Sequence, residues 1–214
     1  METEDKAIAF IKKTAPQIST PEVIYAWTDH DRSFLILRRI KGSTLRDAWT
    51  SLSLSQRHSI VKSIATLCDI LAQNTSQMLG SATGRPVLEP FLSPSDSGLL
   101  GLLTREECKR YFSVSSGDCP PLGGDFYFYH PDLGPGNIIV SDDGRVAGIL
   151  DWEAAGYYPA FWIATKPSVS PGLNFYPPIV ECDDHEWRKC LRMELERRGY
   201  PQASEWYIKW KTFR

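Results

Sequence analysis

The chain has 214 residues, of which 42% are hydrophobic and 12% aromatic, so it can bury a substantial core in one or two domains. Its 24 basic and 26 acidic residues are well mixed, which argues against a nucleic-acid-binding surface or a polybasic membrane anchor. No apolar run approaches the roughly 20 residues that span a bilayer, and the acidic first residues are unlike a secretory signal. We therefore expect a cytoplasmic protein that binds small molecules or other proteins, with no nucleic acid and no membrane.

The first part of the chain predicts a helix followed by a hairpin. Residues 3–13 place apolar side chains near one helical face, with acids in the first turn and lysines in the last. Residues 23–27 and 33–40 are rich in branched and aromatic side chains and flank a polar turn, as in a β-hairpin. Because a lone hairpin with an apolar edge tends to pair further, we expect a homodimer or a covering segment from the C-terminal region.

The rest of the chain predicts mainly helices. Serine caps and an apolar stripe at helical spacing indicate a long core helix over about 55–73. Residues 80–101 are dense in Gly, Pro and Ser and predict an ordered surface loop, after which TREECKRYFS predicts another helix. The C-terminal part then predicts a Pro-rich loop (166–178), a helix (183–198) and an aromatic segment that packs back on the body, SEWYIKWKTF.

One stretch carries an ordered set of polar residues between short expected strands. His130 and Asp132 lie on a loop after FYFY, Asn137 follows five residues after the aspartate, and Asp151 ends a later apolar strand. An aspartate on such a loop can orient a substrate hydroxyl and accept its proton, while asparagine and aspartate oxygens suit magnesium and nucleotide phosphates. The order and spacing therefore indicate phosphoryl transfer rather than a polar turn whose aspartates serve as caps.

The strings HPDLGPGN and ILDWE resemble the H-G-D-x-x-x-x-N and I-D-W-E patterns of the aminoglycoside phosphotransferase and choline kinase family. The likeness to fungal members extends over about residues 4–165. It implies that Asp132 is the catalytic base and that His130 is the catalytic-loop residue that braces it. It also implies that Asn137 and Asp151 bind the metal and the cofactor, which would be Mg²⁺ and ATP.

The same resemblance implies an α+β, protein-kinase-like fold in two parts. Residues 1–42 are expected to be a remnant of the small N-terminal lobe and the hinge, with one helix and a two-stranded hairpin. Residues 43–214 are expected to form the large, mainly helical lobe, with a short β-hairpin catalytic region that carries the catalytic and metal-binding loops.

The chain also departs from the family pattern, and we expect it to be N-terminally truncated, because no glycine-rich hairpin or strand lysine precedes residue 23. Glu4 could correspond to the family's helix glutamate, but we prefer the interpretation of a solvated acid in the first helical turn. The expected hinge holds Arg38 and Arg39 instead of an acidic and an aromatic residue. Pro131 replaces the loop glycine and restricts the backbone around it.

Two functions remain open from the sequence. The first is ATP- and Mg²⁺-dependent phosphoryl transfer to a hydroxyl of a small-molecule substrate. The second is a degenerate phosphotransferase, a pseudokinase, repurposed as an ATP-independent enzyme or a small-molecule binding protein in a metabolite pathway. Some aromatic side chains after the second aspartate could form a stacking wall for a substrate, although core packing is the expected role for most of them. These are Trp152, Tyr157, Tyr158, Phe161 and Trp162.

Overall fold

The computed structural model describes these parts of the chain: residues 3–30, 32–114, 117–175 and 186–212. Helix α1 spans Glu4–Thr14, and it forms as predicted because acids in its first turn and lysines in its last complement the helix dipole. Its buried face consists of Ala7, Ile8 and Ile11, which belong to the same apolar core as the helices of the remaining chain. The predicted boundary between residues 42 and 43 stays a prediction.

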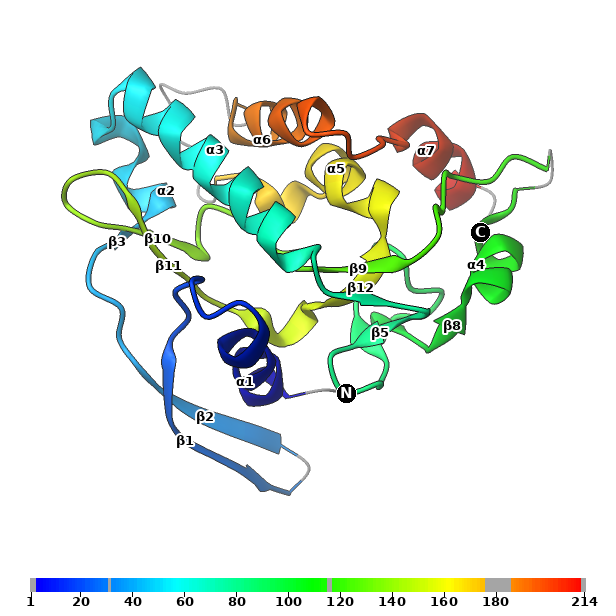
Figure 1. Ribbon diagram of the computed structural model, residues 1–214, viewed down its shortest axis with the longest axis horizontal. Helices are drawn as coiled ribbons and strands as arrows, with labels where there is room; N and C mark the ends of the chain where they lie inside the picture. The colour runs from blue at the N-terminus through cyan, green and yellow to red at the C-terminus, as the bar shows by residue number, and fades with distance from the viewer. Residues whose placement is uncertain (1–2, 31, 115–116, 176–185, 213–214) are drawn as a thin grey trace.

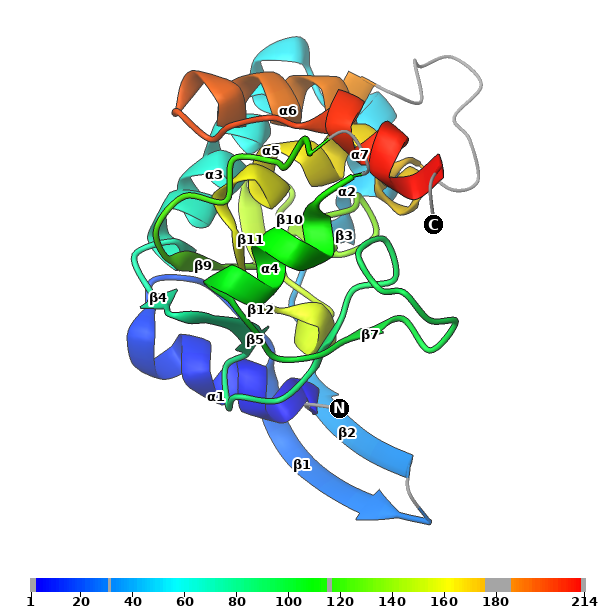
Figure 2. The same cartoon turned by 90° about the vertical axis from the view of Figure 1, so that its right-hand side faces the viewer.

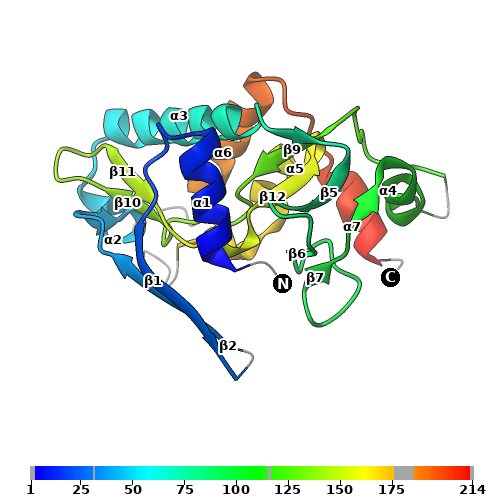
Figure 3. The ribbon, with the colours of Figure 1, turned by 60° about the horizontal axis from the view of Figure 1, so that its bottom comes forward.

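Strands β1 (Glu22–Asp29) and β2 (Arg32–Arg38) form the predicted antiparallel hairpin, which lies beside α1 and extends beyond the rest of the molecule (Figures 1 and 3). The outer face of this hairpin is aromatic, and the rings of Trp27 and Phe34 stack with centroids 4.9 Å apart. Within the described residues, neither strand pairs with a third strand. Both edges of the hairpin are therefore open in the described part of the chain.

Helix α3 (Leu54–Leu71) is the predicted long core helix. It begins with a capping box, in which the Ser53 hydroxyl accepts from the N–H of Gln56 and the Gln56 side chain accepts from the N–H of Ser53. Helix α3 packs on α6 (Glu186–Arg197), and α6 packs on α5 (Ala160–Val169), so the three helices cover one side of the molecule (Figure 1). The start of the helix predicted over 183–198 lies outside the described residues.

The Pro-rich loop predicted over 166–178 is wrong at its start, because α5 continues to Val169. Pro167 has no backbone N–H, so α5 lacks one helical hydrogen bond there. Pro167 lies near the end of α5, however, and the apolar face of this helix is fully buried. Burial of that face therefore outweighs the local cost of the proline. The short 3-10 turn η3 (Pro171–Leu173) follows, and residues 176–178 lie outside the described part of the chain.

The segment predicted as a loop over 80–101 contains short strands. Strand β5 (Met78–Ser81) joins a five-stranded sheet, and β6 (Val87–Leu88) pairs with β7 (Leu99–Leu100). The apolar side chains of this segment are buried, so its backbone N–H and C=O groups require hydrogen-bond partners. Strand pairing supplies these hydrogen bonds. The segment is thus part of the folded body.

The strands expected around the polar loop are present and belong to two sheets. Strand β9 (Phe126–Tyr129) pairs with β12 (Gly156–Pro159) in the five-stranded sheet of order β4-β9-β12-β5-β8. Strand β10 (Ile138–Val140) pairs with β11 (Val146–Ile149) and with β3. The remaining elements are α2 (Leu45–Ala48), α4 (Arg105–Phe112), β3 (Ser43–Thr44), β4 (Thr75–Ser76), β8 (Leu103–Thr104), η1 (Trp49–Ser51), η2 (Trp152–Ala154) and α7 (Ser204–Thr212).

Helix α7 confirms that the last aromatic segment packs back on the body (Figure 2). Its Trp206, Tyr207 and Trp210 are buried, and the indole N–H of Trp206 donates to the carbonyl of Phe112 at the end of α4. Among the helices that the structure describes, none combines the length and the apolar character needed to cross a membrane.

Candidate active site

Strand β9 leads into a loop whose histidine is fully buried. The Nδ1 atom of His130 accepts the N–H of Asp132 at 3.1 Å, so the ring proton must lie on Nε2, which donates to the carbonyl of Leu150 at 3.0 Å. Burial lowers the pKa of His130, in agreement with this neutral form. His130 therefore ties the loop to the strand end that precedes Asp151.

Asp132 and Asn137, at the two ends of the loop, are joined directly. The side-chain amide of Asn137 donates to the backbone carbonyl of Asp132 at 2.9 Å and to its Oδ2 at 3.0 Å. Gly134, inside this loop, packs closely on Gly172, because a Cβ added to Gly134 would lie 3.0 Å from the carbonyl oxygen of Gly172. Since the amide nitrogen of Asn137 makes both bonds, its oxygen remains for another partner.

Asp151 follows β11 in a left-handed backbone conformation, with φ 62° and ψ 63°. Such a conformation is costly for a residue other than glycine and clusters at functional sites. Burial, followed by the charges of Glu153 and Asp132, raises the pKa of Asp151 to about 6. The N–H of Leu150 donates to the carbonyl of Asn137 at 2.8 Å, and this bond fixes the end of β11 relative to the end of the loop.

Glu4 also lies in this region, and the preferred interpretation of a solvated acid is wrong. Its Oε1 accepts the backbone N–H of Trp152 at 3.1 Å, and burial raises the pKa of Glu4. Burial also raises the pKa of Glu153, with Glu4 and Asp132 as further causes. The charges that contribute to the raised pKa values of Glu4, Asp151 and Glu153 are those of neighbouring carboxylates.

A cavity of about 430 Å³ opens beside the end of β2, at the expected hinge. Its lining is mostly apolar, and we call it the hinge cavity. Arg38 and Arg39 contribute to its rim, and Leu150, the neighbour of Asp151, forms part of its wall. The lining consists of Pro21, Leu37, Arg38, Arg39, Ile40, Gly42, Ser43, Thr44, Asp47, Ile139 and Leu150.

A second cavity, of about 220 Å³, is lined by both Asp132 and Asp151, and we call it the Asp132 cavity. Pro131, which replaces the glycine of the family pattern, is buried and forms part of the same wall. The lining also includes Glu89 and Lys166, which are nearly inaccessible to solvent. Asp132 and Asp151 thus line one cavity, and Leu150, the residue before Asp151, lines the other.

Glu89 and Lys166 were not among the site residues expected from the sequence. The available signal was weak: Lys166 is the only charged residue between Glu153 and Glu181, and Glu89 is the only one between Arg85 and Asp96. A single charge inside an apolar stretch indicates a buried pair only when its partner is known, and these two residues lie 77 positions apart.

The aromatic residues after Asp151 serve mainly as core, as expected. Trp152, Tyr158, Phe161 and Trp162 are fully buried, and Tyr157 is partly buried against the same core.

In the turn after β10, the Ser141 hydroxyl donates to the carboxylate of Asp143. Cys182 to His185, expected to open a helix, lie outside the described residues.

Solved structures share this fold. Aminoglycoside phosphotransferase APH(3'')-Id from Streptomyces rimosus is 17% identical, with a TM-score of 0.54, over 98% of this chain and 81% of that one. A type VIII aminoglycoside-3'-phosphotransferase is 16% identical (TM-score 0.53; 98% and 79% covered), and ADP-bound APH(2'')-Ib is 14% identical (TM-score 0.51; 97% and 70% covered). These likenesses establish an α+β, protein-kinase-like fold.

No curated protein matches the sequence. The model of one family, described as the phosphotransferase enzyme family, matches residues 1–162 and so includes α1, the hairpin, the loop with Asp132 and the segment after Asp151. This chain belongs to the phosphotransferase enzyme family.

Proposed function

We propose that the protein transfers a phosphoryl group from ATP to a hydroxyl of a small molecule. One observation carries the proposal: the consecutive residues Leu150 and Asp151 line different cavities. The hinge cavity is apolar and suits a nucleotide base, while the Asp132 cavity suits an acceptor. The carboxylate of Asp151 would then lie near the nucleotide phosphates, at the place where the nucleotide and the acceptor molecule approach each other.

In this proposal Asp132 is the catalytic base that orients the acceptor hydroxyl and takes its proton. His130 keeps the loop in place through its bonds to the Asp132 N–H and the Leu150 carbonyl. The Asn137 amide fixes the direction of the Asp132 carboxylate. Each of these contacts reduces the freedom of the base, which is how positioning contributes to rate.

Magnesium fits the oxygen donors of this site. No group of three acidic, histidine or cysteine side chains within the described residues converges as a complete metal cage. Mg²⁺ does not need one, because it is commonly bound by one or two protein oxygens together with substrate phosphates and water. Asn137 and Asp151 would hold it, and it would neutralise charge on the phosphates. The unpaired carboxylates around Asp151 favour the binding of a cation.

Two relatives support nucleotide as the donor. One structure with this fold is of ADP-bound APH(2'')-Ib, and another is of a GDP and kanamycin complex of a related enzyme. We propose a nucleotide donor for this chain as well. The acceptors of those enzymes are not carried over, since their sequence identities to this chain are 14%.

The proposal is tested by binding of ATP with and without Mg²⁺, measured by calorimetry on the wild type and on Asp151→Ala. We expect Mg²⁺-dependent binding that Asp151→Ala loses and that Asp143→Ala, a turn variant, retains. Absence of binding to the wild type at millimolar ATP would overturn it. If ATP binds, Asp132→Asn is expected to retain affinity and to slow transfer about 10²- to 10⁴-fold.

The second candidate is a protein that has kept the fold and lost the transfer. It is favoured by the bond of Glu4 to the backbone N–H of Trp152, since this carboxylate forms no ion pair with a lysine within the described residues. The same calorimetry separates the two candidates, because a protein that has lost the transfer and works without ATP is expected to show no Mg²⁺-dependent ATP binding.

A further inference from the structure

Glu89 and Lys166 form a buried ion pair in the wall of the Asp132 cavity. The Nζ of Lys166 lies 2.7 Å from Oε1 and 2.9 Å from Oε2 of Glu89, and the side chains are 6% and 0% exposed. A buried charge pair costs free energy of desolvation and is weak evidence for stability as such. Its place in the same cavity lining as Asp132 and Asp151 points to a role in the cavity.

The carboxylate of Glu89 is fully occupied. Besides Lys166, its Oε2 accepts the indole N–H of Trp162 at 3.1 Å, and its Oε1 accepts the backbone N–H of Phe91 at 3.1 Å. Three donor groups therefore make four contacts with the two oxygens of Glu89. Glu89 serves to hold the ammonium of Lys166 in place.

Lys166 still has a donor to offer. An ammonium has three N–H groups and no acceptor, and the two oxygens of Glu89 can engage at most two of them. The ring of Phe91 lies 4.2 Å from Nζ and stabilises the charge, but it offers no oxygen or nitrogen acceptor. Lys166 lines the cavity, so its remaining N–H is available to an oxygen bound there.

We propose that Lys166 is a specificity-determining residue that donates a hydrogen bond to a second oxygen of the acceptor, whose reacting hydroxyl lies at Asp132. The acceptor is then a compact, uncharged molecule with at least two oxygens and a partly apolar body. This inference rests on the proposed function, because the cavity is taken as the acceptor site.

Charge selects an uncharged acceptor. Glu89 already neutralises Lys166, and the carboxylates of Asp132, Asp151 and Glu153 in the same lining repel an anion. A cationic group beside Lys166 would face an ammonium that cannot accept a hydrogen bond. A neutral hydroxyl, ether or carbonyl oxygen meets neither penalty.

Size and lining select a compact acceptor. The volume of about 220 Å³ is below the roughly 300 to 1,000 Å³ of pockets that hold drug-sized ligands. Leu88, Pro90 and Phe91 add apolar surface to the lining. A short carbon chain with two oxygens matches this mixed lining, whereas a polycationic aminosugar does not.

The first test measures binding without turnover. Straight-chain diols of three to six carbons, the monohydric alcohols of equal length, choline and kanamycin are titrated into ¹⁵N-labelled wild-type protein. The indole resonance of Trp162, assigned with Trp162→Phe, reports on the cavity because its N–H bonds to Glu89. We expect at least one diol to shift this resonance with about tenfold higher affinity than its monohydric alcohol. Equal affinity for diols and monohydric alcohols, or binding only of choline or kanamycin, overturns the proposal.

The second test uses variants of the pair. Lys166→Met alone leaves a buried, unpaired Glu89 and is expected to fold poorly, so the decisive variant is Glu89→Gln/Lys166→Met, which removes both charges together. We expect this double variant to lose the preference for the diol and to bind the monohydric alcohol unchanged. A purely structural pair would instead change the unfolding free energy and leave the preference intact, which overturns the proposal.

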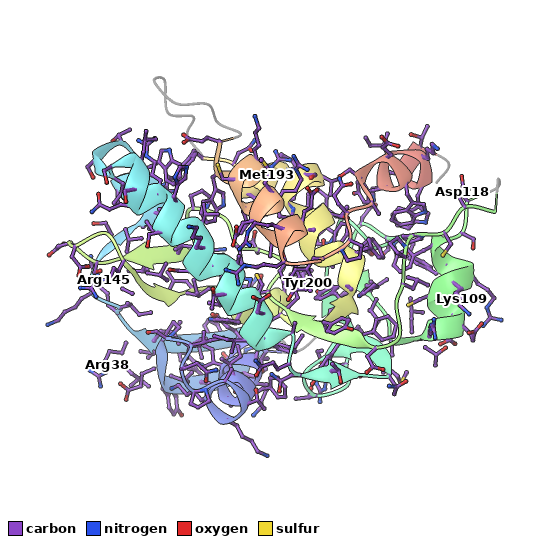
Figure 4. The ribbon with its side chains drawn as sticks, turned by 45° about the horizontal axis from the view of Figure 1, so that its top comes forward. Arg38, Lys109, Asp118, Arg145, Met193 and Tyr200 are labelled. Carbon is purple, nitrogen blue, oxygen red and sulfur yellow. The ribbon has the colours of Figure 1, made fainter. Side chains whose placement is uncertain are left out.

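The matched control is Lys109→Met. Lys109 forms an exposed ion pair with Glu106 on α4 and projects from the outer surface (Figure 4). It is expected to leave the diol preference unchanged. ATP binding is measured on the same samples: if a diol binds as expected but no nucleotide does, the proposed phosphoryl transfer fails while the assignment of Lys166 to a ligand oxygen stands.

Discussion

Glu4 accepts a hydrogen bond from the backbone N–H of Trp152 at 3.1 Å, although 148 positions separate the two residues in the sequence. Asp151, whose left-handed conformation is costly, immediately precedes the bonded N–H. The bond fixes the peptide that follows Asp151 and so helps to hold the direction of its carboxylate. Helix α1 thus contributes a side chain to the site through its first turn.

Replacing Glu4 by alanine is expected to lower the unfolding free energy by about 1 to 3 kcal/mol, because a half-buried N–H loses a charged acceptor. It is also expected to weaken Mg²⁺-dependent ATP binding, because Asp151 is no longer held in place. Glu4→Gln keeps a side-chain oxygen that can accept the same N–H and is expected to retain most of both properties. Urea unfolding and calorimetry measure the two effects. If Glu4→Ala binds ATP like the wild type, Glu4 does not position Asp151.

Trp187 of α6 donates its indole N–H to the carbonyl of Leu133 at 3.2 Å, inside the loop between Asp132 and Asn137. Trp187→Phe leaves that buried carbonyl without its partner, so we expect a loss of about 1 to 3 kcal/mol in unfolding free energy. A looser loop is also expected to slow phosphoryl transfer, measured at saturating ATP.

The control for this variant is Trp206→Phe on α7. The indole N–H of Trp206 also donates to a buried backbone carbonyl, that of Phe112, at 3.1 Å. We expect a similar loss of stability and no change in transfer rate. Equal slowing by both variants would mean that the effect of Trp187→Phe comes from general destabilisation.

The order of the polar residues was readable from the sequence because the loop is local. His130, Asp132 and Asn137 lie within eight positions between two strands with clear β-propensity, so their proximity follows from the turn alone. Asp151 was readable because it ends a strand that pairs with the strand after Asn137. The fold class followed from the resemblance of HPDLGPGN and ILDWE to the family patterns.

The role of Glu4 and the pairing of Glu89 with Lys166 could not be predicted, because both depend on packing between distant segments. An acid in the first turn of a helix is ordinarily stabilised by the helix dipole and water, and this accounts for Glu4 without any partner. The helix through Pro167 was missed because local proline rules were given more weight than burial of the preceding apolar face.

The raised pKa of Asp151 predicts an unusual pH dependence of stability. Its value of about 6 in the folded protein exceeds 3.8, so the folded state binds the proton more tightly than the unfolded state. Stability therefore decreases as pH rises from about 4 to 6, and the penalty is fully present above pH 6. Asp151→Asn removes the penalty and is expected to be more stable than the wild type by about 1 to 2 kcal/mol at pH 7, allowing for solvent at the half-buried group.

Urea unfolding from pH 4 to 8 measures this difference, which should vanish near pH 4. Asp143→Asn is the contrasting control, because the bonds of Asp143 to Ser141 and Arg145 lower its pKa. Its removal should give no gain in stability at pH 7. A constant advantage of Asp151→Asn at every pH would show that titration of Asp151 is not the cause.

The outer face of the hairpin predicts self-association. Tyr25 and Ile36 are cross-strand neighbours that remain 61% and 47% exposed, beside the stacked rings of Trp27 and Phe34. An exposed apolar hairpin with open edges is a template for pairing with a second copy. We expect light scattering after size exclusion to report a dimer at micromolar concentration.

The double variant Tyr25→Thr/Ile36→Thr is expected to shift the protein to monomer, because threonine keeps β-propensity while removing most of the apolar area. The control is Ile208→Thr on α7, which replaces an equally exposed apolar side chain, 62% accessible, far from the hairpin along the chain. It should leave the mass unchanged. A wild-type protein that remains monomeric at every concentration would contradict the prediction, and dimers in all three proteins would place the interface elsewhere.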